Sequence, residues 1–329
     1  MRKVLVTGGA GYVGSVLVPK LLEEGHCVTV LDLYLYGADA LAAVRGHPNL
    51  REVKGDLRDP LVVAVSMRGC DTVIHLACIS NDPSFELNPD LGKSINYDAF
   101  RPLVRIAKNA GVNRFIYASS SSVYGVKDDD EVTEETSLDP LTDYSKYKAM
   151  CETVLAEERA PGMVTCTVRP STVCGYSPRQ RLDVVVNILT NHAYHNRRIQ
   201  VLGGAQKRPN IHIDDMVDLY LFLLQARDKA IDGKTYNVGC ENHTVMELAE
   251  IVQRVVGKDI PIDVKPTNDM RSYHVSSRRI EEELGFRTKR SIEDAVRDLV
   301  NAFSDGRLPD TMTDPRYYNI RRMQDIDLR

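Results

Sequence analysis

A glycine-rich turn near the N-terminus places the strictest limit on how this chain can fold. The chain reads KVLVTGGAGYVG from Lys3 to Gly14, so a short β-branched run leads directly into glycines at positions 8, 11 and 14. Glycines at this spacing let the backbone turn tightly, approach a ligand and pack the next helix against the strand. The helical pattern over 13–25 therefore predicts a strand–turn–helix unit.

Apolar runs alternate with helical patterns through the first half of the chain. Because these runs are apolar on both faces, they predict buried parallel strands. Segments with helical spacing and a glycine stop, such as 13–25 and 99–111, lie between them. This βαβα order predicts the α/β class with a doubly wound parallel sheet. The expected strands cover 3–8, 27–33, 50–56, 71–77, 114–120 and 164–170.

The pattern changes after about residue 172, where helices outweigh short strands. We expect residues 1–172 to form the first domain and residues 173–329 a smaller mixed α/β domain, with segments near 206–240 returning to the first. The tail over 313–329 predicts no element. The expected helices cover 181–196, 214–228, 244–257 and 291–303, and the expected strands cover 199–203, 235–239 and 260–266.

Charge and apolar patterning weigh against two classes of partner. The chain carries 42 Lys and Arg against 46 Asp and Glu, a net charge of -4, so electrostatics alone does not favour nucleic acid. No apolar stretch approaches the roughly 18 residues of a membrane-spanning helix. The seven cysteines are scattered and form no CxxC pair, which favours a reduced, cytoplasmic protein over a disulfide framework.

The glycine turn is also a candidate phosphate cradle, because free N–H groups at a helix start bind anions. Asp32 ends the next expected strand, where a carboxylate accepts hydrogen bonds from a ribose 2′-hydroxyl and repels a 2′-phosphate. This favours NAD over NADP, although Asp32 is alternatively a turn aspartate. Asp56 ends the third expected strand, where it contacts an adenine or caps the following helix. The cradle consists of Gly8, Gly11, Tyr12, Val13 and Gly14.

Two motifs further along suggest a catalytic pair and a hydroxyl donor. In YSKYK, Tyr144 and Lys148 are four residues apart and share one face of a helix, although a solvated helix face is the alternative interpretation. The serine run 119–122 ends an expected strand, at the sheet edge where open α/β folds bind ligands, although a plain loop is the alternative. In this order, the motifs bring a cofactor, a hydroxyl donor and a base to one crevice.

The ordered motifs resemble those of the extended short-chain dehydrogenases/reductases that act on nucleotide sugars, and most closely the NAD-dependent nucleotide-sugar 4-epimerases of the UDP-glucose 4-epimerase kind. The resemblance implies a Rossmann-type first domain, a second domain that binds a nucleotide-diphosphate sugar, and a homodimer paired through helices near 90–111 and 145–160. The matching motifs, found between about residues 3 and 220, are TGGAGYVG, GDLRD, VIHLA, SSSSVYG, YSKYK, VRPSTVCG and RPNIHIDD.

The resemblance also implies a role for each matching residue. Tyr144 is expected to be the base, Ser120 to hydrogen-bond the reacting hydroxyl, and Lys148 to hold the nicotinamide ribose while lowering the pKa of the phenol. Arg208 matches the family's pyrophosphate arginine, and Asn96 matches an asparagine that braces the catalytic region. Further cofactor contacts are expected from Leu57, Leu76 and Ala77. Substrate contacts are expected from Ser80, Ser121, Ser122, Tyr144, Thr172, Asn187, Arg208 and Arg271.

These roles imply epimerisation at C4 through a transient 4-keto sugar, with NAD regenerated. The family's 4,6-dehydratases carry an Asp-Glu pair at the two positions after the catalytic serine, and its decarboxylases carry Glu at the second. Here both are serines, Ser121 and Ser122, which disfavours dehydration and decarboxylation. A 4-ketoreductase or dehydrogenase with exchangeable NAD(P)(H) is a second hypothesis, and a non-catalytic NAD-binding scaffold or sensor is a third.

The remaining polar residues suggest no further chemistry. His75 lies in an apolar strand and is expected to be a satisfied core residue, and His212 is expected to anchor a turn. The histidines lack metal-site spacing, so no metal is expected. Arg179 and Arg181 in SPRQRLD are placed near the mouth of the site without an assigned role.

Overall fold

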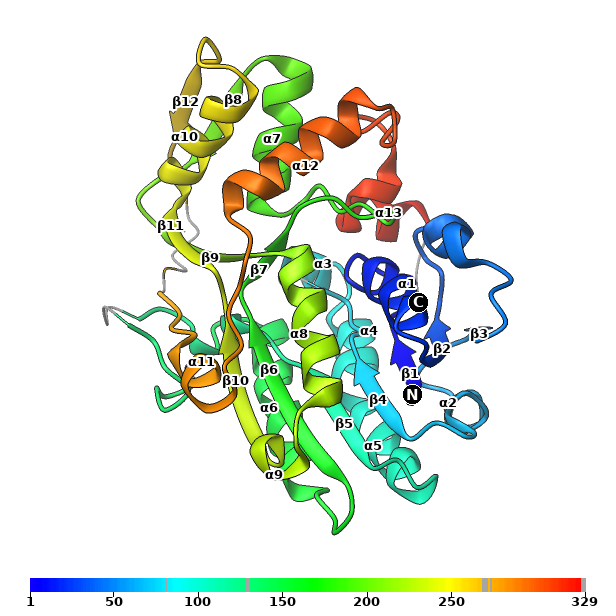
Figure 1. Ribbon diagram of the computed structural model, residues 1–329. Helices are drawn as coiled ribbons and strands as arrows, with labels where there is room; N and C mark the ends of the chain where they lie inside the picture. Colours follow the sequence, from blue (N-terminus) through cyan, green and yellow to red (C-terminus); the bar gives the residue numbers. More distant parts are fainter. Residues whose placement is uncertain (81, 128–130, 268–271, 273, 327–329) are drawn as a thin grey trace.

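The computed structural model describes residues 1–80, 82–127, 131–267, 272 and 274–326. Its centre is a seven-stranded sheet in the order β3-β2-β1-β4-β5-β6-β10, and every neighbouring pair runs parallel (Figure 1). This sheet confirms the predicted doubly wound, Rossmann-type fold. The strands are β1 Lys3–Thr7, β2 Cys27–Asp32, β3 Leu50–Lys54, β4 Thr72–His75, β5 Arg114–Ala118, β6 Val164–Pro170 and β10 Lys234–Val238.

The strand order reverses beside β1, which pairs with β2 on one side and with β4 on the other. The loops that follow β1 and β4 therefore diverge and leave a crevice at the carboxyl edge of the sheet, where such folds bind ligands. β10 forms the far edge of the sheet, beside β6, although segments of the smaller part of the structure both precede and follow it in the chain.

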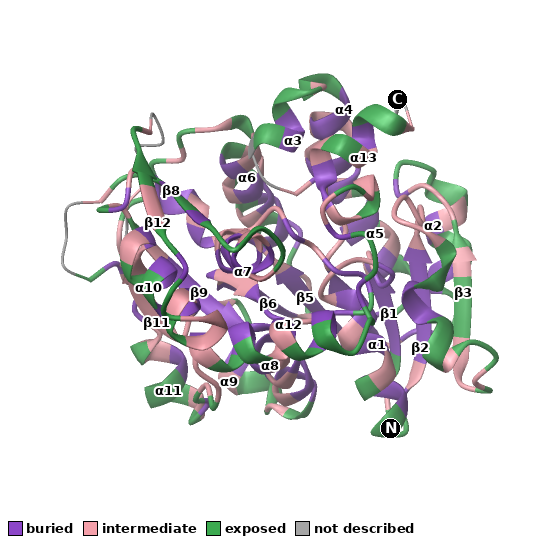
Figure 2. Cartoon of the chain, turned by 90° about the horizontal axis from the view of Figure 1, so that it is seen from above, coloured by how far each residue is buried: buried purple, intermediate pink, exposed green. Residues whose placement is uncertain are grey.

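Helices cover both faces of the large sheet (Figure 1). One face packs against α1 Gly14–Glu23 and α8 Ile213–Gln225, and the other packs against α2 Pro60–Met67, α5 Phe100–Asn109 and α6 Asp143–Glu157. Figure 2 shows the inner strands of the large sheet largely buried, its edge strand β3 more exposed, and many exposed residues on the outer sides of the helices. This layering explains the doubly apolar central strands, because β1, β2, β4 and β5 each contribute side chains to both cores.

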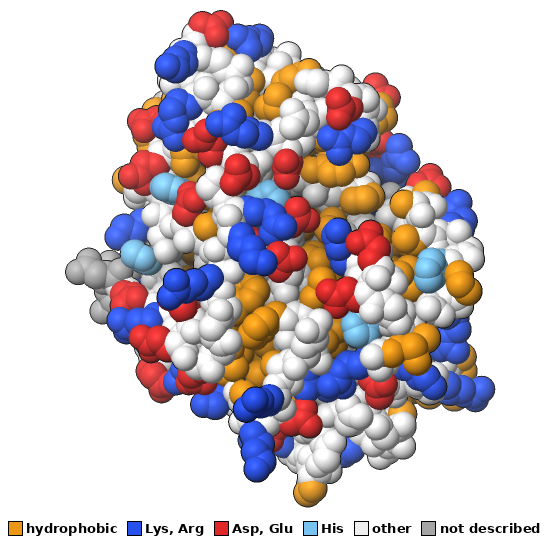
Figure 3. Space-filling view, viewed as in Figure 1, with side chains coloured by type: hydrophobic (Ala, Val, Ile, Leu, Met, Phe, Trp, Pro, Cys, Tyr) orange, Lys and Arg blue, Asp and Glu red, His pale blue; other side chains and the backbone are white. Residues whose placement is uncertain are grey.

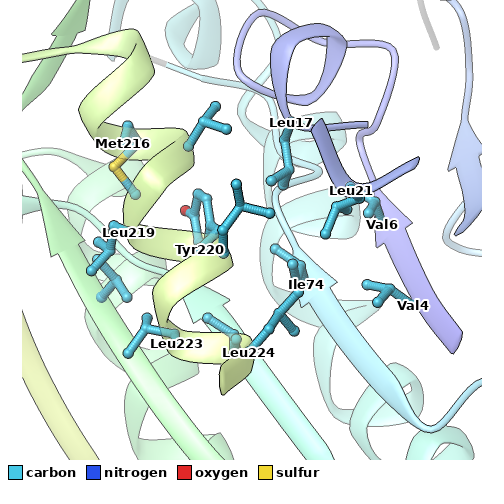
Figure 4. Close-up of a cluster of buried hydrophobic side chains, with 14 of the residues drawn as sticks. Val4, Val6, Leu17, Leu21, Ile74, Met216, Leu219, Tyr220, Leu223 and Leu224 are labelled. Atoms are coloured by element: carbon cyan, nitrogen blue, oxygen red, sulfur yellow. The ribbon is translucent and has the colours of Figure 1, made fainter. Parts of the chain in front are cut away.

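The first core lies between the sheet and helices α1 and α8. Full burial of one aliphatic side chain of this kind stabilises the fold by roughly 1.5–3 kcal/mol. The core thus holds α1, and with it the glycine turn, firmly against β1. Figure 4 labels its central side chains: Val4, Val6, Leu17, Leu21, Ile74, Met216, Leu219, Tyr220, Leu223 and Leu224.

The smaller part of the structure lies beyond the carboxyl edge of the sheet (Figure 1). Three helices, α7 Val185–Asn196, α10 Val245–Val256 and α12 Ile292–Ser304, share one apolar core with the strand β8. Two small sheets complete it, one of two strands and one of three. Their strands are β8 Ile199–Leu202 with β12 Ile262–Lys265, and β11 Glu241–Thr244 with β9 Lys207–His212 and β7 Thr172–Cys174. The domain division at residue 172 stays a prediction.

Short elements connect these parts or extend from them. Three of them bear on the site, namely η2, which is a π-helical turn, η3, which follows Ser120, and α13, which lies in the tail where no element was predicted. The short elements are η1 Ala38–Val44, α3 Asp82–Glu86, α4 Pro89–Lys93, η2 Ser94–Asp98, η3 Ser121–Tyr124, α9 Asp228–Ile231, α11 Arg278–Leu284, η4 Pro315–Tyr317 and α13 Asn319–Asp325.

The outer surface shows no simple charge pattern. On the face in Figure 3, basic and acidic side chains are interspersed over both parts of the structure. In the part of the chain that the structure describes, each helix is too short or too polar to cross a membrane. All seven cysteines are free thiols.

The packing between α1 and the sheet generates a stability prediction. Leu17 is fully buried, so Leu17→Ala should lower the free energy of unfolding by about 2–5 kcal/mol through lost burial and a residual cavity. Leu61→Ala is the matched control, because Leu61 is 77% exposed and its loss should change stability by less than about 0.5 kcal/mol. Urea denaturation followed by circular dichroism measures both, and equal losses would contradict this account of the core.

Candidate active site

A cavity of about 360 Å³ opens at the carboxyl ends of β1, β2, β4 and β5. It reaches from the glycine turn to the first turns of α6, and it also touches β7 and α13. Segments far apart in the sequence therefore share one crevice. The predicted site residues that line it are Gly8, Gly11, Tyr12, Val13, Gly14, Asp32, Asp56, Leu57, Leu76, Ala77, Ser80, Ser120, Ser121, Ser122, Tyr144, Lys148 and Thr172.

The glycine turn has no room for side chains at its two ends. Gly8 has φ +75°, and a Cβ there would lie 2.7 Å from the backbone N of Ala77 in the loop after β4. A Cβ on Gly14 would lie 2.5 Å from the backbone O of Gly8. The turn thus presents bare backbone at the start of α1, which is the cradle that a dinucleotide diphosphate requires.

Asp32 holds the turn from the end of β2. Its carboxylate accepts hydrogen bonds from the N–H of Ala10 at 3.0 Å and from the N–H of Tyr34 at 2.7 Å. Burial raises the pKa of Asp32, while these two backbone donors oppose that shift. Asp32 therefore stabilises the turn, which was the alternative interpretation of this residue. It also lines the cavity, where its carboxylate can accept a hydrogen bond from a ribose hydroxyl.

Asp56 does not cap the helix that follows it. The N-cap of α2 is Asp59, whose Oδ1 accepts the N–H groups of Leu61 and Val62. The capping alternative for Asp56 is wrong because α2 begins one turn later than that hypothesis required. Instead, Asp56 lines the cavity and pairs with Arg58, with Nη2 and Oδ2 2.7 Å apart.

Tyr144 and Lys148 lie on the first turns of α6, as their spacing predicts. Thr142 starts this helix in a reciprocal capping box with Ser145, which explains why it begins just before Tyr144. Lys148 is only 4% exposed, and its Nζ donates to the backbone O of Ala118 at 2.7 Å. The same Nζ lies 5.9 Å from the centroid of the Tyr144 ring. The cation is therefore fixed between the end of β5 and the tyrosine.

Ser120 presents its hydroxyl at the end of β5. It caps η3, and its Oγ accepts the N–H of Ser122 at 3.1 Å and the hydroxyl of Ser122 at 2.9 Å. Because both contacts use Ser120 as an acceptor, its own O–H can donate to a ligand in the cavity. The serine run is thus a capped turn at the sheet edge rather than a plain loop.

A buried polar cluster behind the cavity fixes the serine turn relative to α6. Glu152 lies one turn beyond Lys148, accepts a hydrogen bond from Ser119 and forms an ion pair with Arg169 at 2.6 Å. Arg169 also donates to the hydroxyl of Tyr124 at 2.7 Å, and Tyr124 ends η3. Both members of the ion pair are largely buried, so the pair orients the two catalytic segments firmly.

Two of the predicted site asparagines lie behind the cavity wall. Asn96, in η2, accepts the N–H of Ile79 at 2.8 Å and donates to its O at 2.9 Å, so it braces the loop after β4. Asn187 is fully buried, donates to the Tyr12 hydroxyl at 2.9 Å and accepts the N–H of Gly175 at 3.0 Å. It was predicted as a substrate contact, but here its amide joins the glycine turn to the start of the smaller part.

Neither of the two arginines that were predicted to bind the substrate diphosphate is found among the described residues that line the cavity. Arg208 lies on β9, outside the cavity lining, and its Nη1 donates to the backbone O of Lys207 at 3.0 Å. Arg271 lies outside the described residues. Their contacts with substrate stay predictions.

Tyr36 and Asn319 are among the cavity residues that the sequence analysis did not predict, whereas Arg179 was placed near the mouth of the site without a role. Arg179 stacks on Tyr36, with Cζ 3.4 Å from the ring centroid, and donates to Oδ1 of Asn319 at 2.7 Å. Both arginines of SPRQRLD line the cavity, and the sequence analysis had placed them near its mouth without assigning a role. Asn319 had no signal, because it lies in a tail whose position depends wholly on tertiary packing.

His75 and His212 have the structural roles expected of them. His75 is buried at the end of β4, where its Nδ1 shares a hydrogen bond of 2.7 Å with Thr7 Oγ1. His212 caps α8 by accepting the N–H of Asp214 at 3.1 Å, and its Nε2 lies 3.1 Å from Asp298. His212, Asp214 and Asp298 lie close enough together to hold an ion, although helix capping also accounts for their proximity. The absence of a metal stays a prediction.

The environment of His75 generates a pH prediction. Burial, followed by the nearby charge of Lys148, lowers the pKa of His75 to about 3 in the folded chain. Below pH 6.5 the unfolded chain binds a proton that the folded chain excludes, so stability should fall with pH until about pH 3. From pH 7 to pH 5 this effect amounts to about 2 kcal/mol. Denaturant unfolding of His75→Gln should lack this part of the pH dependence, and parallel profiles for both proteins would contradict it.

Comparison with known proteins places this cavity in a family. The model described as the NAD dependent epimerase/dehydratase family matches residues 4–239. A UDP-glucose 4-epimerase from Lactobacillus helveticus is 28% identical over 315 residues, which cover 89% of this chain and 94% of the relative. A dTDP-glucose 4,6-dehydratase from Streptomyces griseus is 32% identical over 296 residues, covering 86% and 88%.

Solved structures show the same two activities. DesIV, a dTDP-glucose 4,6-dehydratase from Streptomyces venezuelae solved with NAD and TYD bound, superposes with a TM-score of 0.83 at 27% identity, covering 92% of this chain and 97% of its own. The UDP-glucose 4-epimerase of Thermotoga maritima, solved with UDP-glucose, also gives 0.83, at 26% identity and coverage of 92% and 99%. The chain therefore belongs to the NAD-dependent epimerase/dehydratase family of nucleotide-sugar enzymes, and NAD is its cofactor.

Proposed function

We propose that this protein is a NAD-dependent epimerase that inverts C4 of a nucleotide-diphosphate sugar. The observation that carries the proposal is the side-chain chemistry around Tyr144. Among the described residues, the carboxylates that line the cavity are Asp32 and Asp56, which follow β2 and β3 at the cofactor end. Next to Ser120 the lining consists of Ser121 and Ser122, whose hydroxyls are too weakly acidic and basic to drive loss of water.

The residues present suit a reversible oxidation at one carbon. Tyr144 takes the proton of the sugar hydroxyl, and Ser120 donates a hydrogen bond to the same oxygen. Lys148 favours the phenolate that Tyr144 needs, because its ammonium, 5.9 Å from the centroid of the Tyr144 ring, stabilises the anion. NAD held at the glycine turn would supply the reversible hydride acceptance that this oxidation and the return to the alcohol require. Tyr144 then gives its proton back, so the reaction involves no net oxidation.

Inversion also requires room for the oxidised sugar to turn before the hydride returns. Ser121, Ser122 and Thr172 line the same cavity as Tyr144 and Lys148, and their small side chains favour such room. This geometry does not select a particular sugar or nucleotide base. The substrate therefore has to be identified with a panel of UDP-, dTDP-, GDP- and CDP-sugars.

The catalytic assignment is tested with Tyr144→Phe. This change removes only the phenolic oxygen, so kcat should fall by about 10²- to 10⁴-fold, the usual contribution of a general base, while NAD binding stays intact. Tyr147→Phe is the matched control, because Tyr147 lies on the same helix but stacks on Tyr97 outside the cavity. Proton NMR of the sugar panel measures turnover, and wild-type rates in Tyr144→Phe would exclude Tyr144 as the base.

The type of reaction is tested by leaving out added cofactor. An epimerase that regenerates its NAD should complete many turnovers with only the NAD that it carries after purification, as quantified by native mass spectrometry. NADH accumulating in proportion to product would instead favour the ketoreductase or dehydrogenase hypothesis, and release of a 4-keto-6-deoxy product would favour dehydration. No turnover of any sugar by NAD-loaded protein would favour a scaffold or sensor.

We further propose a homodimer that pairs through α5 and α6. These helices pack side by side, and a hollow on their outer surface is lined by Tyr97, Arg101, Arg105 and Val154. Analytical ultracentrifugation measures the assembly directly, and the mass of a single chain at micromolar concentration would overturn the proposal. The cytoplasmic location favoured by the free cysteines stays a prediction.

A further inference from the structure

The C-terminal helix α13 connects the smaller part of the structure to the large sheet across the cavity. Just before this helix, Tyr318 is 7% exposed and belongs to an apolar cluster of the smaller part with Phe303 of α12. Its hydroxyl accepts a hydrogen bond from Asn191 of α7 at 3.1 Å. Five residues later, Met323 is buried on the side of the large sheet. The segment 318–325, the strap, therefore bridges the two parts.

On the side of the large sheet, the strap contacts two loops that border the cavity. Nε of Arg322 donates to the backbone O of Leu35, in the loop after β2, at 2.5 Å. Met323 packs against Ile79, in the loop after β4, and against Ile95 in η2. Because β2 and β4 pair with β1 from opposite sides, these two loops lie on either side of the glycine turn. The strap thus spans the crevice between them.

Asn319, the first residue of α13, is part of the cavity wall. Its Nδ2 donates to Ser80 Oγ, in the loop after β4, at 2.9 Å. Its backbone N–H donates to Oδ2 of Asp183, in the loop between β7 and α7, at 2.8 Å. The helix lies beyond the carboxyl edge of the large sheet, where it packs against α3 (Figure 1). The strap therefore covers the cavity and is fastened on both sides of it.

Few interactions hold the strap on the side of the large sheet. Helix α13 has seven residues, and an isolated helix of this length is not stable in water. Its buried residues are Asn319 and Met323, one turn apart on the same face, whereas Arg321 and Gln324 are exposed. The helix can therefore detach for a small part of the free energy of global unfolding, while Tyr318 stays in its apolar cluster.

We propose that the strap is the gate through which NAD enters and leaves the cavity. When it is closed, as in this structure, it blocks the crevice beside the glycine turn. When it turns about Tyr318, it opens the space between the loops after β2 and β4. Detachment of Arg322 and Met323 then sets the rate of cofactor exchange, so that NAD stays bound over many turnovers. This inference depends on NAD being the cofactor and not on which reaction the enzyme catalyses.

The test measures both rate constants of NADH binding to NAD-free protein, with no sugar present. Met323→Ala removes the apolar anchor, and an open strap admits and releases cofactor alike. The association and dissociation rate constants should therefore rise together, each by about 10- to 100-fold, and the dissociation constant should change little. Stopped-flow fluorescence of NADH follows association, and displacement of NADH by excess NAD follows dissociation.

Three further variants separate a gate from an ordinary wall of the binding site. Met323→Leu keeps the apolar volume and should retain slow exchange. Arg322→Gln loses the hydrogen bond to Leu35 and should accelerate both steps by about 3- to 10-fold without emptying the anchor site. Gln324→Ala, on the exposed side of α13, is the matched control and should change neither rate. Faster release with unchanged association is the mark of a lost contact and would overturn the proposal, as would wild-type rates in both Met323→Ala and Arg322→Gln.

Amide hydrogen exchange measures the opening of the strap directly. The N–H groups of α13 should exchange faster than those of α8, which lies in the main core. Met323→Ala should accelerate exchange in α13 by the same factor as it accelerates release of NADH. Exchange in α13 as slow as in α8 would show that the strap opens only with global unfolding, and it would overturn the proposal.

Discussion

The close contact between two backbones determines the rest of this site. The turn after β1 lies directly against the loop after β4, and Gly8 has no side chain to separate them. This contact occurs where the strand order reverses, so the two loops border one crevice. The core between α1, α8 and the sheet then fixes the start of α1, and the free N–H groups there face the place where a diphosphate binds.

The charges of the cavity are divided between its two ends. Asp32 and Asp56 lie beyond β2 and β3, whereas Lys148 lies at the end of β5 beside Tyr144. Family members that dehydrate and members that epimerise share this frame, because the sheet supplies the crevice and the loop residues supply the chemistry. In this chain the short serine turn after Ser120 is the feature that favours reversible oxidation over loss of water.

Much of the fold could be predicted from local pattern. Of the six strands predicted in the first half, β1, β2, β4 and β5 bury apolar side chains on both faces, and all six are bounded by turn or helix signals, so their existence and order followed from the residues alone. β9 was missed because KRPNIH is polar and contains a proline, and it becomes a strand by pairing with β7 and β11. α13 was missed because its buried apolar anchor, Met323, packs against Ile79, Leu91 and Ile95 from distant segments.

The residues of the site also fall into two groups, those predicted from local sequence and those brought together only by the fold. The sequence by itself determined the glycine cradle, Asp32, the serine turn and the Tyr144–Lys148 pair, because each is a local motif whose geometry follows from one strand end or one helical turn. Only the tertiary structure decided that Asn187 joins the cavity wall to the glycine turn, and that Arg179 and Asn319 reach the cofactor end. The physical reason is that a buried polar side chain takes its role from partners far away in the chain, and no local spacing records them.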